Sequence, residues 1–345
     1  PILDAGQIHA ILEDLLVDFP FRTPANRDNA VGMLLTPVVQ PAIAGNIPMH
    51  PVVAPLERTG KTKLACDLMG HIFKGVSIAP VQFPPNEEEI EKRILAELLR
   101  DGGFVVLDNI RTVVDSPALA SLLTSRLFTG RLLGKSLMVT LPNNLIVLGT
   151  GNNIITSGEI AKRSIPIHLQ PPNDHPEDRV DFKHPDLFEY LASVRSVVLG
   201  ALLGAVELWI AAGRPPHPNR CRLGGFEEWS DVVGGVLHGV GFTEWRANER
   251  NWRRAADPRG EDLKAFVLEW WNRFGMTPMP ARDLSWVARE LGLFLDCFAR
   301  ASEHAQTQAF VAKALTCNID RPVEEFVIRR DNYGSSSRYY LDKVT

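Results

Sequence analysis

Cysteine is scarce in this sequence, and its four thiols stand far apart, at Cys66, Cys221, Cys297 and Cys317. No pair has the spacing of metal ligands, which argues against a cysteine-rich zinc module and against a disulfide scaffold. We therefore expect reduced thiols and a cytoplasmic protein. An initial methionine is also missing, because the chain begins at Pro1. We expect a trimmed or partial chain on that ground.

Long hydrophobic runs are missing too, since no uninterrupted apolar stretch reaches the roughly 18 residues of a membrane span. The most apolar stretch, residues 197–212, is broken by Gly200, Gly204 and Glu207 and predicts a buried helix. An excess of positive charge is also absent, because the formal net charge is −4. Any nucleic-acid contact must therefore come from local basic patches, and no membrane partner is expected.

The 345 residues suffice for two or three domains, and 45% apolar with 23% charged residues is typical of a globular protein. Between residues 27 and 170, short apolar strands alternate with helical patterns. The predicted strands are 49–54, 76–82, 104–107 and 145–149; the predicted helices are 61–73, 87–100 and 118–127, with a hairpin at 132–140. This order predicts an α/β fold in which helices cover a parallel sheet on both faces.

After Pro171 the strand signals stop, and a proline-rich, acidic stretch, residues 171–185, leads into helical patterns as a linker or an ordered loop. The helical blocks are 186–213, 226–241, 262–274, 281–293 and 306–316, followed by strands at 325–330 and 338–341. Three helices followed by two strands are the order of a winged helix. We therefore predict four parts: an N-terminal helical segment 1–26, a nucleotide-binding core 27–170, a helical lid 171–257 and a winged-helix domain 258–345.

A candidate phosphate-binding loop follows the first predicted strand. Gly60, Lys61 and Thr62 fill the last three positions of G-x-x-x-x-G-K-[ST], in which the lysine reaches the β- and γ-phosphates and the hydroxyl binds Mg²⁺. Pro55 stands in place of the first glycine. The alternative is a lysine that merely begins a helix, which the helix dipole disfavours unless an anion is near. The residues predicted to bind ATP are Pro55, Arg58, Thr59, Gly60, Lys61, Thr62 and Lys63.

The end of the strand at 104–107 carries the second polar element, Asp108 and Asn109. Asp108 would join Thr62 in binding Mg²⁺, and Asn109 stands where many motors have the glutamate that polarises water. An amide cannot take up a proton, so Glu89 is a candidate base. The alternative is that the acidic cluster around Glu89 only caps a helix N-terminus.

The third element follows the strand at 145–149, where Asn152 is a candidate sensor that orients water or contacts the γ-phosphate. Its alternative interpretation is a simple turn, because Gly-Asn-Asn is favourable turn chemistry. Each element is weak alone. Three polar strand ends in this order, at domain-like intervals, favour a nucleotide site.

These motifs resemble those of AAA+ ATPases of the replicative-helicase kind found in phages, plasmids and other mobile elements. The chain looks like a relative of the primase-associated and superfamily III helicases and, more distantly, of MCM. The resemblance covers nearly the whole chain. It rests on 54–62 (Walker A), 105–109 (Walker B), 132–136 with 145–153 (sensor 1), and on 159–163, 184–187, 209–215 and 225–229.

The resemblance implies that Arg163 is the arginine finger of a neighbouring subunit, placed to stabilise charge on the transferred phosphoryl group. It therefore implies a ring, with a homo-hexamer expected, and ATP and Mg²⁺ as cofactors. The implied catalytic set is Lys61, Asp108, Asn109, Asn152 and Arg163. Lys162 and Arg163 could equally be a solvated surface pair. Pro55 and Asn109 depart from the family pattern, the first affecting nucleotide affinity and the second the hydrolysis rate.

Candidate DNA contacts lie in two places. A pore hairpin ahead of the sensor strand would present Arg131 and Lys135 to a single strand, through contacts independent of sequence. Both could also be ordinary surface charges. The predicted winged helix offers Lys313, Arg329, Arg330 and Arg338 for backbone contact with duplex DNA. Winged helices also dock proteins, and the acidic residues Glu324 and Glu325 keep that alternative open.

Taken together, the sequence predicts an ATP-dependent DNA translocase or helicase that acts in replication of a mobile element, with a primase or polymerase as a further expected partner. The alternative is a nucleotide-gated adaptor that hydrolyses ATP weakly and recruits another replication protein. Asn109 and Pro55 favour this alternative.

Overall fold

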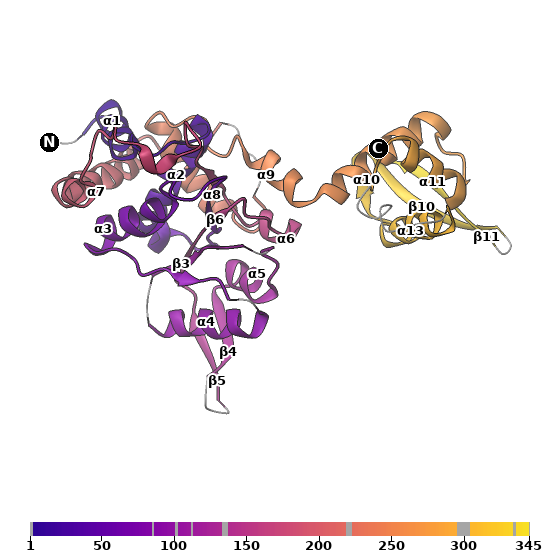
Figure 1. The fold of residues 1–345 in the computed structure, drawn as a ribbon, viewed down its shortest axis with the longest axis horizontal. Helices are drawn as coiled ribbons and strands as arrows, with labels where there is room; N and C mark the ends of the chain where they lie inside the picture. The colour runs from indigo at the N-terminus through magenta and orange to yellow at the C-terminus, as the bar shows by residue number, and fades with distance from the viewer. Residues whose placement is uncertain are drawn as a thin grey trace. The chain divides into compact units, whose positions relative to one another are not determined.

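The computed structural model describes residues 3–84, 86–100, 103–111, 113–132, 137–218, 223–294, 304–333 and 336–344. The chain divides into two compact units, Pro1–Ala256 and Asp257–Thr345. Figure 1 shows a sheet with surrounding helices in the first unit, and helices beside a strand layer in the second. Each unit has its own hydrophobic core.

A parallel sheet forms the centre of the first unit, with its five strands in the order β2-β3-β6-β1-β7. The strands are β1 His50–Ala54, β2 Val81–Gln82, β3 Phe104–Asp108, β6 Ile146–Asn152 and β7 Ile167–His168. The valine-, leucine- and isoleucine-rich runs of β1, β3 and β6 are almost entirely buried, as expected where both faces of a sheet are covered. The predicted α/β fold with a parallel sheet is confirmed, although the second strand is much shorter than predicted.

Helices surround this sheet, and several begin where an Asp, Asn or Ser side chain accepts a hydrogen bond from the first turn. Such N-caps are Asp4, Asn86, Ser116, Ser157 and Asp186. The helices are α1 Ala5–Leu16, α2 Pro24–Val39, α3 Met69–Lys74, α4 Glu87–Leu99, α5 Pro117–Thr124, α6 Gly158–Ala161, α7 Leu187–Ala211, α8 Glu227–Gly239 and α9 Glu249–Ala256. A π-helical segment, Lys63–Leu68, precedes α3, and short 3-10 turns occur at Gln40–Ala42 and Pro176–Asp178.

A two-stranded hairpin projects from the sheet unit beside α4 and α5 (Figure 1). Its strands are β4 Leu127–Arg131 and β5 Met138–Pro142, so it begins earlier than the predicted range of 132–140. One face packs on the unit through Phe128 and Gly130, whereas Leu127 and Met138 are exposed on the other. The hairpin is therefore anchored on one side and open to contact on the other.

Helix α7 contains the stretch for which the sequence predicts burial, and the structure corrects that prediction. It is long and apolar enough to cross a membrane by length and composition. It packs against α1, α2, α3 and α8, as a helix of a soluble fold does, but on one side only. Phe188, Leu203 and Ile210 are each about half exposed. The exposed side carries polar residues such as Glu189 and Glu207 among apolar ones, so the apolar composition of the stretch overstated its burial.

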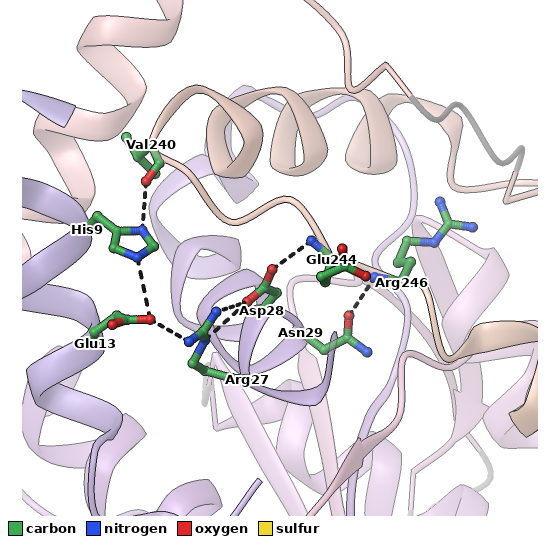
Figure 2. Close-up of polar contacts among 8 residues, drawn as sticks. All are labelled: His9, Glu13, Arg27, Asp28, Asn29, Val240, Glu244 and Arg246. Atoms are coloured by element: carbon green, nitrogen blue, oxygen red, sulfur yellow. Dashed lines mark hydrogen bonds and ion pairs between the residues drawn. The ribbon is translucent and has the colours of Figure 1, made fainter. Parts of the chain in front are cut away.

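A polar network joins the start of α2 to the loop that follows α8 (Figure 2). The buried Asp28 carboxylate accepts a 2.9 Å hydrogen bond from the Glu244 N–H, and the Asn29 side chain accepts one of 2.9 Å from the Arg246 N–H. Nearby, His9 on α1 contacts the Val240 carbonyl oxygen through its ring Nδ1 at 2.9 Å, and the carbonyl accepts. The predicted N-terminal segment and the predicted lid therefore belong to one body with the sheet.

Two glycines, one in a tightly packed helix and one in an open position, provide a test of the helix packing. A Cβ on Gly70 of α3 would lie 2.4 Å from the Val76 carbonyl oxygen and 2.8 Å from the Ser77 Cα, whereas one on Gly200 of α7 would meet nothing within 4 Å. We expect Gly70→Ala to lower the free energy of unfolding by about 1–3 kcal/mol. Gly200→Ala should raise it by up to about 1 kcal/mol, because alanine favours a helix. Urea denaturation of both variants measures this, and equal effects would contradict the packing described.

The second unit places helices beside a four-stranded antiparallel sheet of order β8-β11-β10-β9. Its elements are α10 Pro258–Phe274, β8 Met279–Pro280, α11 Ala281–Glu290, α13 His304–Cys317, β9 Pro322–Val323, β10 Phe326–Tyr333 and β11 Ser336–Lys343. Trp270 and Phe266 are fully buried between the two layers. Trp270 here and Trp229 in the first unit are thus core residues.

Candidate functional site

The three polar strand ends singled out in the sequence meet at one edge of the sheet, because all the strands run parallel. β6 lies between β1 and β3, so its end is adjacent to the loop after β1 on one side and to Asp108 on the other. Ala54 pairs with Asn152, and Leu107 pairs with Gly149. Ligand sites in open parallel sheets form outside such carboxyl ends.

The loop between β1 and the following helix turns through two residues in the left-handed region, Arg58 with φ 57° and Gly60 with φ 97°. The hydroxyl of buried Thr59 donates to the Leu56 carbonyl at 2.8 Å, which ties the loop to itself. The Lys61 amine donates to the same carbonyl oxygen at 2.7 Å. Pro55, at the position of the missing glycine, is exposed. The loop is thus compact, and its lysine is folded back onto its own backbone.

Burial lowers the pKa of Lys61, and the carboxylates of Glu57 and Asp108 act against that shift. A half-buried ammonium group is stabilised by nearby negative charge, so the loop favours an anion. The π-helical segment that begins at Lys63 continues the loop, and burial raises the pKa of its Cys66 thiol to about 12. That thiol is a core group and does not take part in the site.

Thr62 and Asp108 lie together, as predicted: the Thr62 hydroxyl is 3.5 Å from Asp108 Oδ1. Two adjacent ligands of an octahedral Mg²⁺ ion stand about 3 Å apart, so a hydroxyl and a carboxylate at this separation fit that ion. No group of three or more His, Cys, Asp or Glu side chains gathers as a metal site among the described residues. Magnesium at phosphate sites usually has few protein ligands and takes the others from phosphate and water.

A residue that the sequence analysis did not assign also belongs to this cluster. Thr150 on β6 is 1% exposed, and its hydroxyl donates a short hydrogen bond to Asp108 Oδ1. The same hydroxyl oxygen accepts the N–H of Asn109 at 3.4 Å. A threonine near the end of an otherwise apolar buried strand was the only signal for it in the sequence. Its role depends on the neighbouring strand, which the sequence does not show.

The side chain of Asn109 is engaged by a neighbouring arginine. The Asn109 backbone adopts φ 55°, and the side-chain oxygen accepts a 3.0 Å hydrogen bond from Arg111 Nε. Glu89 lies on the first turn of α4, where its N–H is capped by Asn86 and its carboxylate pairs with Lys92 at 2.9 Å. The described contacts of Glu89 are thus those of a capped helix start. They do not join it to Lys61 or Asp108.

A cavity of about 630 Å³ opens directly beside the loop, and Arg58, Thr59, Gly60 and Lys63 form one wall of it. Its other walls are mostly apolar and come from the end of α1, the proline-rich segment and the start of α7. They include Leu15, Phe19, Pro20, Pro171, Pro172, Pro176, Phe182, Pro185, Leu187 and Phe188. This volume is in the range of small-molecule sites. Of the two interpretations of residues 171–185, a linker or an ordered loop, the structure favours the ordered loop, and its part in the cavity was not predicted.

The proline-rich segment is held over the cavity by one carboxylate in the turn after α1. Asp18 accepts the N–H groups of Lys183 and His184, both at 2.8 Å, through its two side-chain oxygens. Arg179 donates to the Asp18 carbonyl at 2.6 Å and lies 4.5 Å from the Phe182 ring centroid. The segment is therefore an ordered wall.

Arg163 follows α6, and its guanidinium pairs with Glu159 at 2.6 Å with about a quarter of the side chain exposed. Lys162 beside it is exposed. Within the chain, Arg163 therefore contacts its own helix, and the described contacts do not include Lys61 or Asp108.

The predicted DNA-contacting residues are at the surface where the structure describes them. Arg131 is exposed at the end of β4, and Lys135 lies outside the described residues. In the second unit Lys313, Arg330 and Arg338 are exposed, whereas Arg329 pairs with Asp320 and with Asp342. The second unit therefore offers three exposed basic side chains, and Arg329 is partly neutralised.

No protein-family model and no curated protein matches this chain. Among solved structures, the chain is similar to an apo structure of the NrS-1 C-terminal region in its A form. The two share 12% sequence identity with a TM-score of 0.47, over 96% of this chain and 74% of that one.

Proposed function

We propose that this protein binds ATP with Mg²⁺ at the edge of its sheet and hydrolyses it to move along DNA during replication of a mobile element. The proposal rests chiefly on one observation: the Thr62 hydroxyl and the Asp108 carboxylate are 3.5 Å apart, beside the loop that carries Lys61. The adjoining cavity supports it, because its apolar walls can take a nucleoside while the loop faces the phosphates.

In this proposal each residue has a separate task. The loop N–H groups and Lys61 hold the β- and γ-phosphates, which requires the lysine to leave the Leu56 carbonyl. Thr62 and Asp108 would hold Mg²⁺, which neutralises charge developing on the phosphates. Asn152, at the end of β6 and next to Ala54, orients the attacking water.

The motor also requires contacts beyond one chain, and we propose a ring of copies in which Arg163 reaches the neighbour's phosphates. To do so it exchanges its Glu159 partner for phosphate oxygen. The β4–β5 hairpin would carry Arg131 and Lys135 to a single DNA strand in the pore. The second unit has a helix–strand–helix–helix order followed by paired strands, which supports a winged helix that contacts duplex DNA through Lys313, Arg330 and Arg338.

The direct test is ATP turnover by the purified chain with and without single-stranded DNA. We expect turnover that DNA stimulates, together with a ring in native mass measurements when a slowly hydrolysed ATP analogue is present. Absence of nucleotide binding would refute the proposal.

The second candidate function is that of a weakly hydrolysing adaptor. It is favoured by the hydrogen bond that ties the Asn109 side chain to Arg111. Tight ATP binding without turnover would support that candidate instead.

A substitution at Arg163 can distinguish an effect on hydrolysis in the neighbouring subunit from an effect on nucleotide binding within the same chain. Because its guanidinium would act only on a neighbour's phosphates, Arg163→Ala should lower turnover at least about 100-fold. Nucleotide affinity should stay within about threefold, since the loop is intact. Lys162→Ala, which removes the exposed adjacent charge, is the matched control and should have little effect. Equal losses of activity in both variants would show that Arg163 is an ordinary surface residue.

A further inference from the structure

Two threonine hydroxyl groups lie within hydrogen-bonding distance of Asp108, both at the same carboxylate oxygen. The Thr62 hydroxyl lies 3.5 Å from Oδ1, and the Thr150 hydroxyl donates to Oδ1 over a shorter distance. The carboxylate is therefore held at one oxygen, and the described residues place no hydrogen bond on the other.

The Thr150 hydroxyl has a partner for both its proton and its oxygen. It donates to Asp108, because a carboxylate can only accept, and its oxygen accepts the Asn109 N–H at 3.4 Å. The side chain is also held in place, because it is 1% exposed and branched at Cβ in the central strand β6. Val52 of β1 lies opposite it in register. The hydroxyl is thus a rigid donor supplied by the middle of the sheet.

The same hydroxyl supports the backbone turn that follows the carboxylate. Asn109 adopts φ 55°, a conformation that asparagine tolerates better than most residues, and its N–H is turned back toward β6. The next N–H, that of Ile110, donates to the Thr150 carbonyl at 2.9 Å. Residues 108–110 are therefore attached to Thr150 through both its side chain and its backbone.

From these contacts we infer that Thr150 is a positioning residue for the metal-binding carboxylate: its hydroxyl fixes Asp108 in the orientation that lets the carboxylate share an ion with Thr62. This inference rests on the proposed function, since it assigns a role within the same site. Groups that hold a metal ligand by hydrogen bonding commonly affect metal affinity 10- to 100-fold. Thr150 is therefore expected to affect the affinity for Mg²⁺ directly and the affinity for nucleotide only indirectly.

The experiment is a Mg²⁺ titration of the binding of a fluorescent ATP analogue to the whole chain. In Thr150→Val, which keeps the shape but removes the hydroxyl, the Mg²⁺ concentration at half-saturation should rise about tenfold or more. Thr150→Ser keeps the hydroxyl and should stay within about threefold of the parent chain. Affinity for the analogue in excess EDTA should be the same in all three proteins, because the loop is unaltered.

Thermal melts of each variant show whether it is folded, and Thr150→Ala, which also lacks the hydroxyl, replaces the valine variant should that one not fold. An unchanged Mg²⁺ requirement in the valine or alanine variant would overturn the role of Thr150 while leaving the proposed function intact. An equal rise in Thr150→Ser would also overturn it, because the hydroxyl would then not be the cause. If the parent chain itself binds the analogue neither with nor without Mg²⁺, both the proposed function and this inference fail.

Discussion

Replacement of Lys61 by alanine is expected to abolish ATP turnover, with a loss of at least about 100-fold. The reason is electrostatic: the ammonium group is half buried, and the described anions near it are the carboxylates of Glu57 and Asp108. In a water-poor site, one preorganised donor to developing charge is typically worth a factor of about 10²–10³ in rate. Turnover of radiolabelled ATP at saturating Mg²⁺ measures the loss.

The control for this prediction is a lysine of the same unit that lies outside the site. Lys74 ends α3, and its amine lies 5.4 Å from the Phe104 ring centroid. Lys74→Ala removes an equal charge and should leave turnover within about twofold. Turnover that survives in Lys61→Ala would exclude the loop as the phosphate site. An equal loss in Lys74→Ala would show that both variants act through stability.

The parallel order of the strands explains why the proximity of Thr62 and Asp108 could be expected from the sequence. Thr62 and Asp108 are 46 positions apart, yet short apolar strands in parallel order bring their ends to one edge. That expectation requires only the position of a polar residue relative to a buried strand. For that reason it placed Lys61, Asp108 and Asn152 around one edge without any knowledge of side-chain contacts.

The parts of the site that the sequence did not give depend on tertiary neighbours. Thr150 differs from any other buried threonine only because β3 lies next to β6 and presents Asp108 to it. For residues 171–185 the sequence left a linker and an ordered loop open, because proline-rich composition does not reveal that Asp18, just after α1, accepts hydrogen bonds from Lys183 and His184. Apolar composition in α7 similarly predicted burial but could not show that one side lacks a neighbour.

The unfolding free energy of the first unit should fall steeply below about pH 6.5, and His50 should be a main cause. His50 is fully buried at the start of β1, and neither ring nitrogen has a hydrogen-bond partner among the residues that the structure describes. Burial lowers its pKa to about 3. Between pH 6.5 and 3, the unfolded chain therefore binds a proton that the folded chain does not. The pH dependence has a definite sign: stability rises with pH across this window and is lost as the pH falls.

The size of the effect follows from 1.36 kcal/mol per unit of pKa difference. At pH 4, His50 alone should lower the free energy of unfolding by about 3 kcal/mol relative to pH 7. Burial likewise lowers the pKa of His168, to about 4, so this histidine adds a smaller loss of stability in the same direction.

Denaturant unfolding of the His50→Leu variant at pH 7 and at pH 4 measures the effect. The difference in unfolding free energy between the two pH values should be about 3 kcal/mol smaller than in the parent chain. His175→Ala, which alters a largely exposed histidine, should leave the difference unchanged. If His50→Leu has the pH dependence of the parent, His50 is protonated in the folded chain and the packing around β1 must accommodate its charge.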